Sequence, residues 1–105
     1  MLISEYRAPF DVGASRELMG FHQTPIDARE YREVIILAAD RYVGTLDPLS
    51  TTVAVAQVVR DHVAEFSAWP EYQEVAVKLG LAPRYVCTLR NIAIKGIIDF
   101  ITRVI

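Results

Sequence analysis

Cysteine is almost absent from this chain of 105 residues, which contains only Cys87. A single cysteine cannot form an intramolecular disulfide, so we expect a reducing, cytoplasmic location. The first ten residues, MLISEYRAPF, lack the basic stretch and apolar run of a signal peptide. The most apolar run, residues 92–105, is shorter than a membrane span and carries Lys95, Asp99 and Arg103. We therefore expect no membrane association.

Residues typical of catalysis are also scarce. The only histidines are His22 and His62. His62 lies on the apolar stripe of an expected helix, which favours a hydrogen-bonded core residue. A weak metal site with Asp61 and Glu65 is the alternative, but their spacing does not bring three ligands together. The sequence contains no glycine-rich phosphate loop and no paired catalytic carboxylates. We expect a non-catalytic protein without a metal or cofactor.

The chain has no excess of positive charge. It contains 11 Lys and Arg against 13 Asp and Glu, which gives a net charge of −2 and a pI of about 5.6. This balance counts against a general affinity for nucleic acid, although a local basic patch can still bind. Hydrophobic residues are abundant at 52%, with a mean hydropathy of +0.25. A small domain cannot hide that many apolar groups, which indicates an oligomer or a binding partner.

Apolar residues recur at helical spacing, so we predict one all-α domain over residues 1–105. The fold expected is a small bundle of four to five helices, with residues 1–24 as an N-terminal arm. A short helix from Ser15 to about Phe21 is one reading of that arm. Thr24 and Pro25 then provide a helix start, and that helix should run to about Val43.

A second start signal follows at Asp47-Pro48. It predicts a helix from about Pro48 to Phe66, with Ser50 as an alternative cap. The β-branched residues at 51–53 lower helix propensity, so a strand there is the less favoured reading. Pro70 is expected to open the next helix.

Residues 71–91, EYQEVAVKLGLAPRYVCTLRN, read as a short amphipathic helix, a tight turn and a second helix. Gly80 stands where a helix C-terminus needs a residue that tolerates positive φ. Pro83 suits the first position of the second helix, because its missing N–H is not needed there. This last helix is expected to continue to the C-terminus, with a bend at Gly96 as one option.

This stretch resembles the helix-turn-helix of bacterial transcription regulators, and LGLAPRYV and LRNI are similar in wording to LuxR-type DNA-binding domains. The spacing from Val86 to Leu89 is one residue shorter than in those domains. The resemblance covers about a fifth of the chain and implies binding to duplex DNA. The residues that carry it are Val75, Ala76, Leu79, Gly80, Leu81, Val86 and Leu89.

By resemblance, the second helix supplies the contacts to bases, and its polar face suits that role. Arginine and asparagine can pair with guanine and adenine in the major groove. The predicted base contacts are Arg84, Thr88 and Asn91, with Cys87 as a further candidate. The predicted phosphate contacts are Lys78, Arg90 and Lys95. The alternative, weighted about equally, is the solvated face of an ordinary helical corner, since such corners are common in all-α proteins and motif matches include false positives. Glu71 and Glu74 in the first helix count against DNA.

A second apolar strip on the last helix is wider than one core requires. We predict that it forms a homodimer interface, and the alternative is that the N-terminal arm covers it. A second hypothesis for function uses the same strip: an antiactivator-like regulator that sequesters a partner protein, with an architectural helix-turn-helix. The predicted interface residues are Ile94, Ile98, Ile101 and Ile105.

Overall fold

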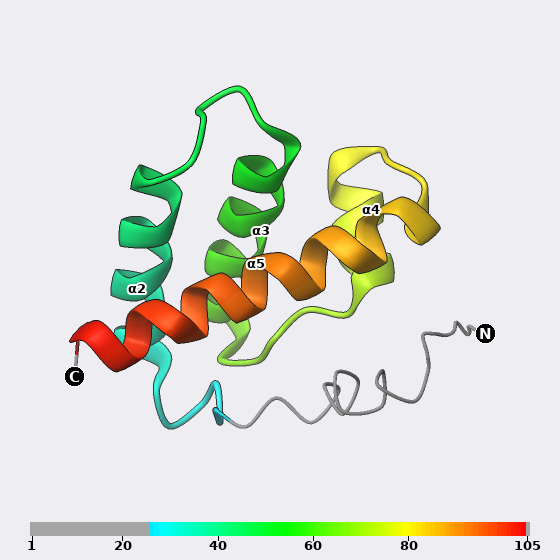
Figure 1. Ribbon diagram of the computed structural model, residues 1–105. Helices are drawn as coiled ribbons and strands as arrows, with labels where there is room; N and C mark the ends of the chain where they lie inside the picture. The colour runs from blue at the N-terminus through cyan, green and yellow to red at the C-terminus, as the bar shows by residue number, and fades with distance from the viewer. Residues whose placement is uncertain (1–25, 105) are drawn as a thin grey trace, which may run out of the picture.

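Helices alone form the regular structure of residues 26–104, which are the residues that the computed structural model describes. Helices α2 and α3 lie side by side, α5 runs across both, and α4 lies beside the N-terminal part of α5 (Figure 1). The prediction of an all-α fold is confirmed for this part of the chain. The arm at residues 1–24 and its short helix lie outside it. The helices are α2 (Arg32–Gly44), α3 (Thr51–Phe66), α4 (Tyr72–Leu79) and α5 (Pro83–Val104).

Helix α2 begins later than the sequence predicts. Its first residue is Arg32, and Asp27 holds the preceding segment in a separate turn. One Asp27 carboxylate oxygen accepts the N–H of Arg29 at 2.9 Å, and the Asp27 carbonyl accepts the N–H of Tyr31 at 3.0 Å. These bonds form one capped turn ahead of α2, and the regular helix starts after it, at Arg32. The predicted start at Pro25 lies outside the described residues.

Helix α3 begins at Thr51, because Ser50 is the residue that caps it. The Ser50 hydroxyl accepts the Val53 N–H at 3.3 Å. Asp47 instead closes a turn, in which its carboxylate accepts the Leu49 N–H at 3.0 Å. The alternative cap is therefore the one observed, and the strand reading of residues 51–53 is wrong. The β-branched residues there are helical because Val53 and Val55 pack into the core.

Three helices contribute the centre of the core. The two facing helices α2 and α3 bury Ala38, Ala39 and Ala56, and these small side chains let the backbones approach closely. Helix α5 then closes the core across them with Ile97 and Ile101, which are 0% and 1% exposed. The remaining fully buried large residues are Ile35, Val55, Val59, Val63, Val75, Val86 and Pro70.

Gly96 leaves room on α5 for the Tyr42 ring of α2. A Cβ added to Gly96 would lie 2.3 Å from two atoms of the Tyr42 ring, so no larger residue fits without movement of that ring. The Tyr42 ring also packs against Phe100, with ring centroids 6.1 Å apart. Burial raises the pKa of the Tyr42 hydroxyl, and the nearby Asp99 carboxylate adds to this effect. Gly96 therefore serves helix packing, and α5 continues unbroken through it.

The described helices also bear on two expectations about membranes and metals. None of them is long and apolar enough to cross a membrane. Within residues 26–104, no three His, Cys, Asp or Glu side chains gather as potential metal ligands.

Candidate nucleic-acid interface

Helix α4 starts with a reciprocal capping arrangement. Glu71 is the N-cap, and its N–H donates to Glu74 Oε1 at 2.8 Å. The Glu71 side chain in turn accepts a backbone N–H of the first turn. Both carboxylates therefore stabilise the positive end of the helix. The helix begins at Tyr72, two residues after the predicted start at Pro70, because Pro70 and Glu71 are extended before it.

The turn between α4 and α5 is formed as the sequence predicts. Gly80 has φ of +68°, the left-handed region that favours glycine. The Leu81 N–H donates to the Ala76 carbonyl at 3.1 Å, which satisfies the end of α4. Helix α5 then begins at Pro83, as predicted. Val75, Ala76 and Val86 are buried at the crossing of the two helices, so the corner has the tight packing that its sequence indicates.

The first part of α5, residues 83–91, exposes most of the side chains predicted to contact DNA. Arg84 and Thr88 are exposed, Asn91 is half-buried, and Lys95 is exposed one turn further on. Their spacing of four, three and four residues places them on one face of the helix. Lys78 is exposed on α4. Among the described residues, no hydrogen bond or ion pair engages the charged groups of Arg84, Lys95 or Lys78.

Arg90 has a different position from the one its predicted role requires. Its Nε donates to the carbonyl oxygen of the buried Pro70 at 2.7 Å, across the segment that joins α3 to α4. Burial lowers the pKa of the Arg90 guanidinium, while the Glu71 carboxylate and Cys87 oppose that shift. The side chain is therefore committed to holding α5 against the α3–α4 connection. The prediction of a free phosphate contact at Arg90 is corrected accordingly.

Asn91 is bound to the same guanidinium. Arg90 Nη1 donates to Asn91 Oδ1 at 3.0 Å. The amide oxygen of this base-contact candidate therefore already has one hydrogen-bond donor within the protein. Cys87, the further candidate, is half-buried on α5 and lies near Arg90.

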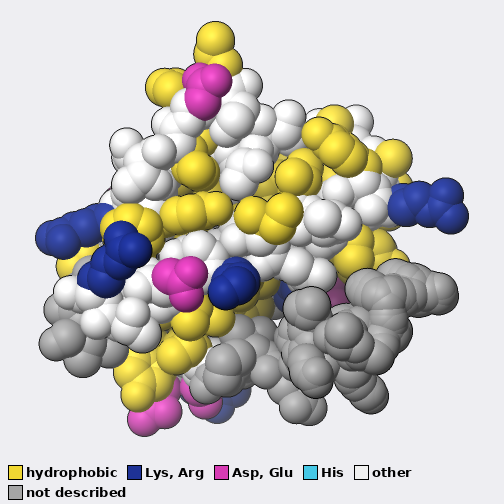
Figure 2. All heavy atoms as spheres, in the orientation of Figure 1, with side chains coloured by type: hydrophobic (Ala, Val, Ile, Leu, Met, Phe, Trp, Pro, Cys, Tyr) yellow, Lys and Arg dark blue, Asp and Glu magenta, His cyan; other side chains and the backbone are white. Residues whose placement is uncertain are grey.

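Charge is distributed very unevenly along the chain. Residues 1–74 contain twelve Asp and Glu against six Lys and Arg, whereas residues 75–105 contain one against five. The net charge of −2 therefore combines an acidic part with a basic one that begins inside α4. In the view that looks onto α5, Lys and Arg side chains lie at both ends of the helix and near its middle, with hydrophobic side chains between them (Figure 2). Residues 75–105 therefore carry a net positive charge, with cations spread along α5 and not gathered at one point of the visible face.

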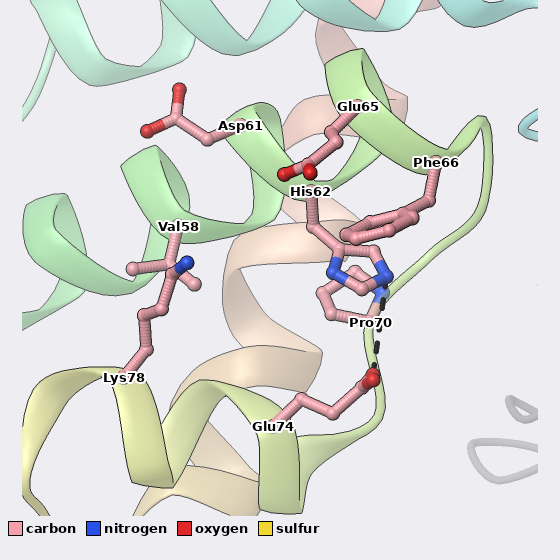
Figure 3. A pocket seen from close by; sticks show the side chains of 8 residues that line it. All are labelled: Val58, Asp61, His62, Glu65, Phe66, Pro70, Glu74 and Lys78. Atoms are coloured by element: carbon pink, nitrogen blue, oxygen red, sulfur yellow. Dashed lines mark ion pairs between the residues drawn. The ribbon is translucent and has the colours of Figure 1, made fainter.

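A cleft of about 180 Å³ lies between α3 and α4 (Figure 3). Its wall includes His62, whose Nε2 is 3.9 Å from Glu74 Oε1 and whose ring lies 4.6 Å from that of Phe66. The side chain of His62 is 17% exposed, so it belongs to the cleft wall and not to the enclosed core. The full lining is Val58, Asp61, His62, Glu65, Phe66, Pro70, Glu74 and Lys78. Only Lys78 is shared with the predicted DNA contacts.

The predicted interface strip is mostly inside this chain. Ile94 and Ile101 are 6% and 1% exposed, because α5 crosses both α2 and α3 and buries two of its faces. Ile98 is half-buried, and the side chain of Ile105 lies outside the described residues. Ile94 and Ile101 are therefore reassigned from an interface with a partner to the core of the chain itself.

Two exposed apolar residues on α5 were not predicted from the sequence. Tyr85 is 53% exposed and Ile92 is 48% exposed, seven residues further along the same helix. On α4, Val77 is 83% exposed. The position of Tyr85 next to Arg84, outside the apolar stripe of α5, was the available signal for its exposure.

No family model, curated protein or solved structure matches this chain. The geometry of α4 and α5 is therefore the basis for assigning a function.

Proposed function

We propose that this protein is a small non-catalytic regulator that binds duplex DNA with the first part of α5. The observation that carries the proposal is the exposed face formed by Arg84, Thr88 and Lys95, with Asn91 at its edge. Arginine and asparagine donate to base edges in the major groove, and lysine neutralises phosphate. Lys78, on the helix that precedes the turn, lies outside this face and is assigned to a phosphate.

The position of α5 also supports the proposal. Its first part lies beside α4, away from α2, whereas its second part crosses α2 and α3 (Figure 1). A helix of 22 residues is about 33 Å long at 1.5 Å per residue. Its first turns can therefore enter a major groove about 12 Å wide while the rest remains in the core.

The negative net charge of the whole chain is not shared by the segment that contains the end of α4 and the first part of α5. From Val75 to Ile98 the chain contains four cations and no carboxylate. Salt screens charges beyond about 8–10 Å, so the local cations determine the interaction with a phosphate backbone in contact with them. Glu71 and Glu74 are engaged in capping α4.

The proposal is tested by fluorescence anisotropy of the full chain with a labelled mixed-sequence 20-bp duplex at two salt concentrations. We expect binding that weakens steeply with salt, since each phosphate contact releases counterions. Arg84→Ala should weaken binding about tenfold or more, in the range for losing one arginine–base contact. Circular dichroism should show unchanged helicity, because Arg84 has no partner in the described structure.

Arg41→Ala is the matched control, since it also removes one exposed arginine without a partner among the described residues, but from the last turn of α2. It should leave the affinity within about twofold. Absence of binding at about 100 μM protein, the weak end of non-specific affinities, would contradict the proposal. Equal losses in both variants would show only a dependence on net charge.

A second candidate function, the capture of a partner protein or of a second copy of the chain, is favoured by the exposed apolar side chains. Tyr85 and Ile92 lie on the same face of α5, two turns apart. Exposing both to solvent is unfavourable unless a partner covers them. A homodimer through this surface would cover the helix that the first proposal assigns to DNA. The first part of α5 therefore cannot bind DNA while Tyr85 and Ile92 are covered by a second copy.

Light scattering during size-exclusion chromatography separates them. If the apolar surface joins two copies, the wild-type protein should elute as a dimer and Ile92→Asp as a monomer. If α5 is free for DNA, Ile92→Asp should leave the mass unchanged and weaken duplex binding by adding a negative charge next to the phosphates.

A further inference from the structure

One apolar side chain lies among the residues assigned to DNA. Ile92 is 48% exposed. It follows Thr88 by four residues and precedes Lys95 by three, so the three side chains are neighbours on one face of α5. Thr88 and Lys95 are both exposed there. A duplex that contacts both of them therefore also covers Ile92.

The charges around Ile92 indicate which kind of partner suits this face. Within residues 26–104, no hydrogen bond or ion pair engages the charged group of Lys95. From Val75 to Ile98 the chain contains four cations and no carboxylate. The face is therefore best matched by a ligand that combines negative charge with an apolar group close to it. In duplex DNA the phosphate backbone supplies the charge.

The edges of the bases in the major groove are mostly polar. Guanine presents two acceptors, cytosine a donor, adenine one of each, and thymine an acceptor beside its C5-methyl group. An aliphatic side chain placed against a donor or acceptor displaces water and returns no hydrogen bond, which is unfavourable. The thymine methyl group is thus the base feature that Ile92 can cover favourably.

We propose that Ile92 is a specificity-determining residue that selects thymine by packing against its C5-methyl group. This inference rests on the proposed binding of duplex DNA by α5. It also gives the exposure of Ile92 a physical reason, because a side chain that is unfavourable in water becomes buried in the complex.

The test starts with selection of binding sites by the full-length wild-type protein from a 20-bp duplex library with a randomised centre. In the selected duplex, each thymine is then replaced singly by deoxyuridine, which lacks only the methyl group. At the thymine that Ile92 contacts, this change should weaken wild-type binding about fourfold, the effect of one buried methyl group. In Ile92→Ala the same change should weaken binding by less than about 1.5-fold, because the apolar contact is already lost.

Returning the methyl group on a different base provides a second measurement. A C·G pair in place of the sensitive T·A pair should lower wild-type affinity, and 5-methylcytosine at that position should recover about fourfold. The affinity of Ile92→Ala should not respond to this methylation. Leu37→Ala, which shortens a side chain that is 42% exposed on α2, is the matched control and should keep the full deoxyuridine effect. Circular dichroism verifies that both variants are folded.

The outcomes distinguish the inference from the function on which it rests. Tolerance of deoxyuridine at every thymine, or equal losses in wild type and Ile92→Ala, would overturn the inference and leave the DNA-binding proposal standing. Conversion of a dimer to a monomer by Ile92→Ala, with deoxyuridine tolerated, would assign the side chain to a second copy of the chain. Failure of the wild-type protein to enrich any duplex would overturn both proposals.

Discussion

The two parts of α5 have the same amphipathic pattern but different surroundings. In residues 83–91 Val86 is the one fully buried apolar side chain, and it packs at the corner with α4, while the Arg90 guanidinium is largely buried against Pro70. In residues 92–103 four side chains are buried, because this part lies across α2 and α3 together. The buried residues of the second part are Ala93, Ile94, Ile97 and Ile101.

This difference explains why the apolar strip of α5 is so wide. A helix packed on one neighbour needs one stripe, whereas a helix seated on two neighbours buries two adjacent stripes. The excess of isoleucine in the second part is therefore used within one chain. The first part packs against α4 and, through Arg90, against the α3–α4 connection. It leaves Arg84, Tyr85 and Thr88 exposed and available for a ligand.

The largest expected difference between the two parts is in the free energy of unfolding, when a buried isoleucine is compared with an exposed one. Ile97→Ala is expected to lower the free energy of unfolding by about 2–5 kcal/mol, because the residue is 0% exposed and its loss leaves a cavity. Ile92→Ala, at 48% exposure, should change it by less than about 1 kcal/mol. Urea denaturation followed by circular dichroism measures both. Equal effects would show that the two positions have similar surroundings.

Arg90 provides the next largest contrast, within the first part itself. Arg90→Met should lower the free energy of unfolding by about 1–3 kcal/mol, since it leaves the buried Pro70 carbonyl without its donor. Arg84→Met removes the same charge from an exposed position and should stay within about 0.5 kcal/mol of wild type. Thermal unfolding of both variants is the measurement. A stable Arg90→Met protein would indicate that the bond contributes little.

A substitution at Gly96 tests the close contact between the second part of α5 and the Tyr42 ring of α2. Alanine improves helix propensity by about 1 kcal/mol, but its Cβ would collide with the Tyr42 ring. Overpacking costs about 1–3 kcal/mol, so we expect Gly96→Ala to destabilise the fold by about 1 kcal/mol net. In a Tyr42→Leu background the same change should instead stabilise. A stabilising effect of Gly96→Ala alone would contradict the packing role.

The smallest expected effect concerns salt dependence. If Lys95 contacts a phosphate, Lys95→Gln should reduce the slope of log K against log salt for duplex binding by about 0.9. Arg103→Gln, near the other end of α5, should leave the slope unchanged, since Arg103 lies over the Phe100 ring at 4.5 Å. Both variants should be as stable as wild type within about 0.5 kcal/mol. An equal change in slope would extend the binding surface along the whole helix.

Local rules predicted the helices and the corner well. Gly80 and Pro83 ended one helix and began the next because their backbone preferences are intrinsic to the residue types. The start of α2 was missed, since Thr24-Pro25 resembles a helix start, whereas Asp27 closes a separate turn before the helix begins at Arg32. Periodicity also identified the exposed face that contains Arg84 and Thr88.

The candidate site was less predictable at Arg90 and Asn91. Spacing placed both near an exposed polar face, and nothing in the sequence joins them to Pro70, twenty residues earlier. The direction of an amide depends on which group lies beside it in space, and a spacing rule contains no information on that.

The sequence by itself determined the all-α class, the α4–α5 corner and the separation of the basic segment from the acidic one. These follow from backbone preferences, helical periodicity and the order of charges, which are all local properties. Only the tertiary structure decided that Ile94 and Ile101 belong to the core, and that Arg90 is bound to Pro70. Burial and hydrogen bonding depend on which helices meet, and the crossing of α5 over α2 and α3 sets that arrangement.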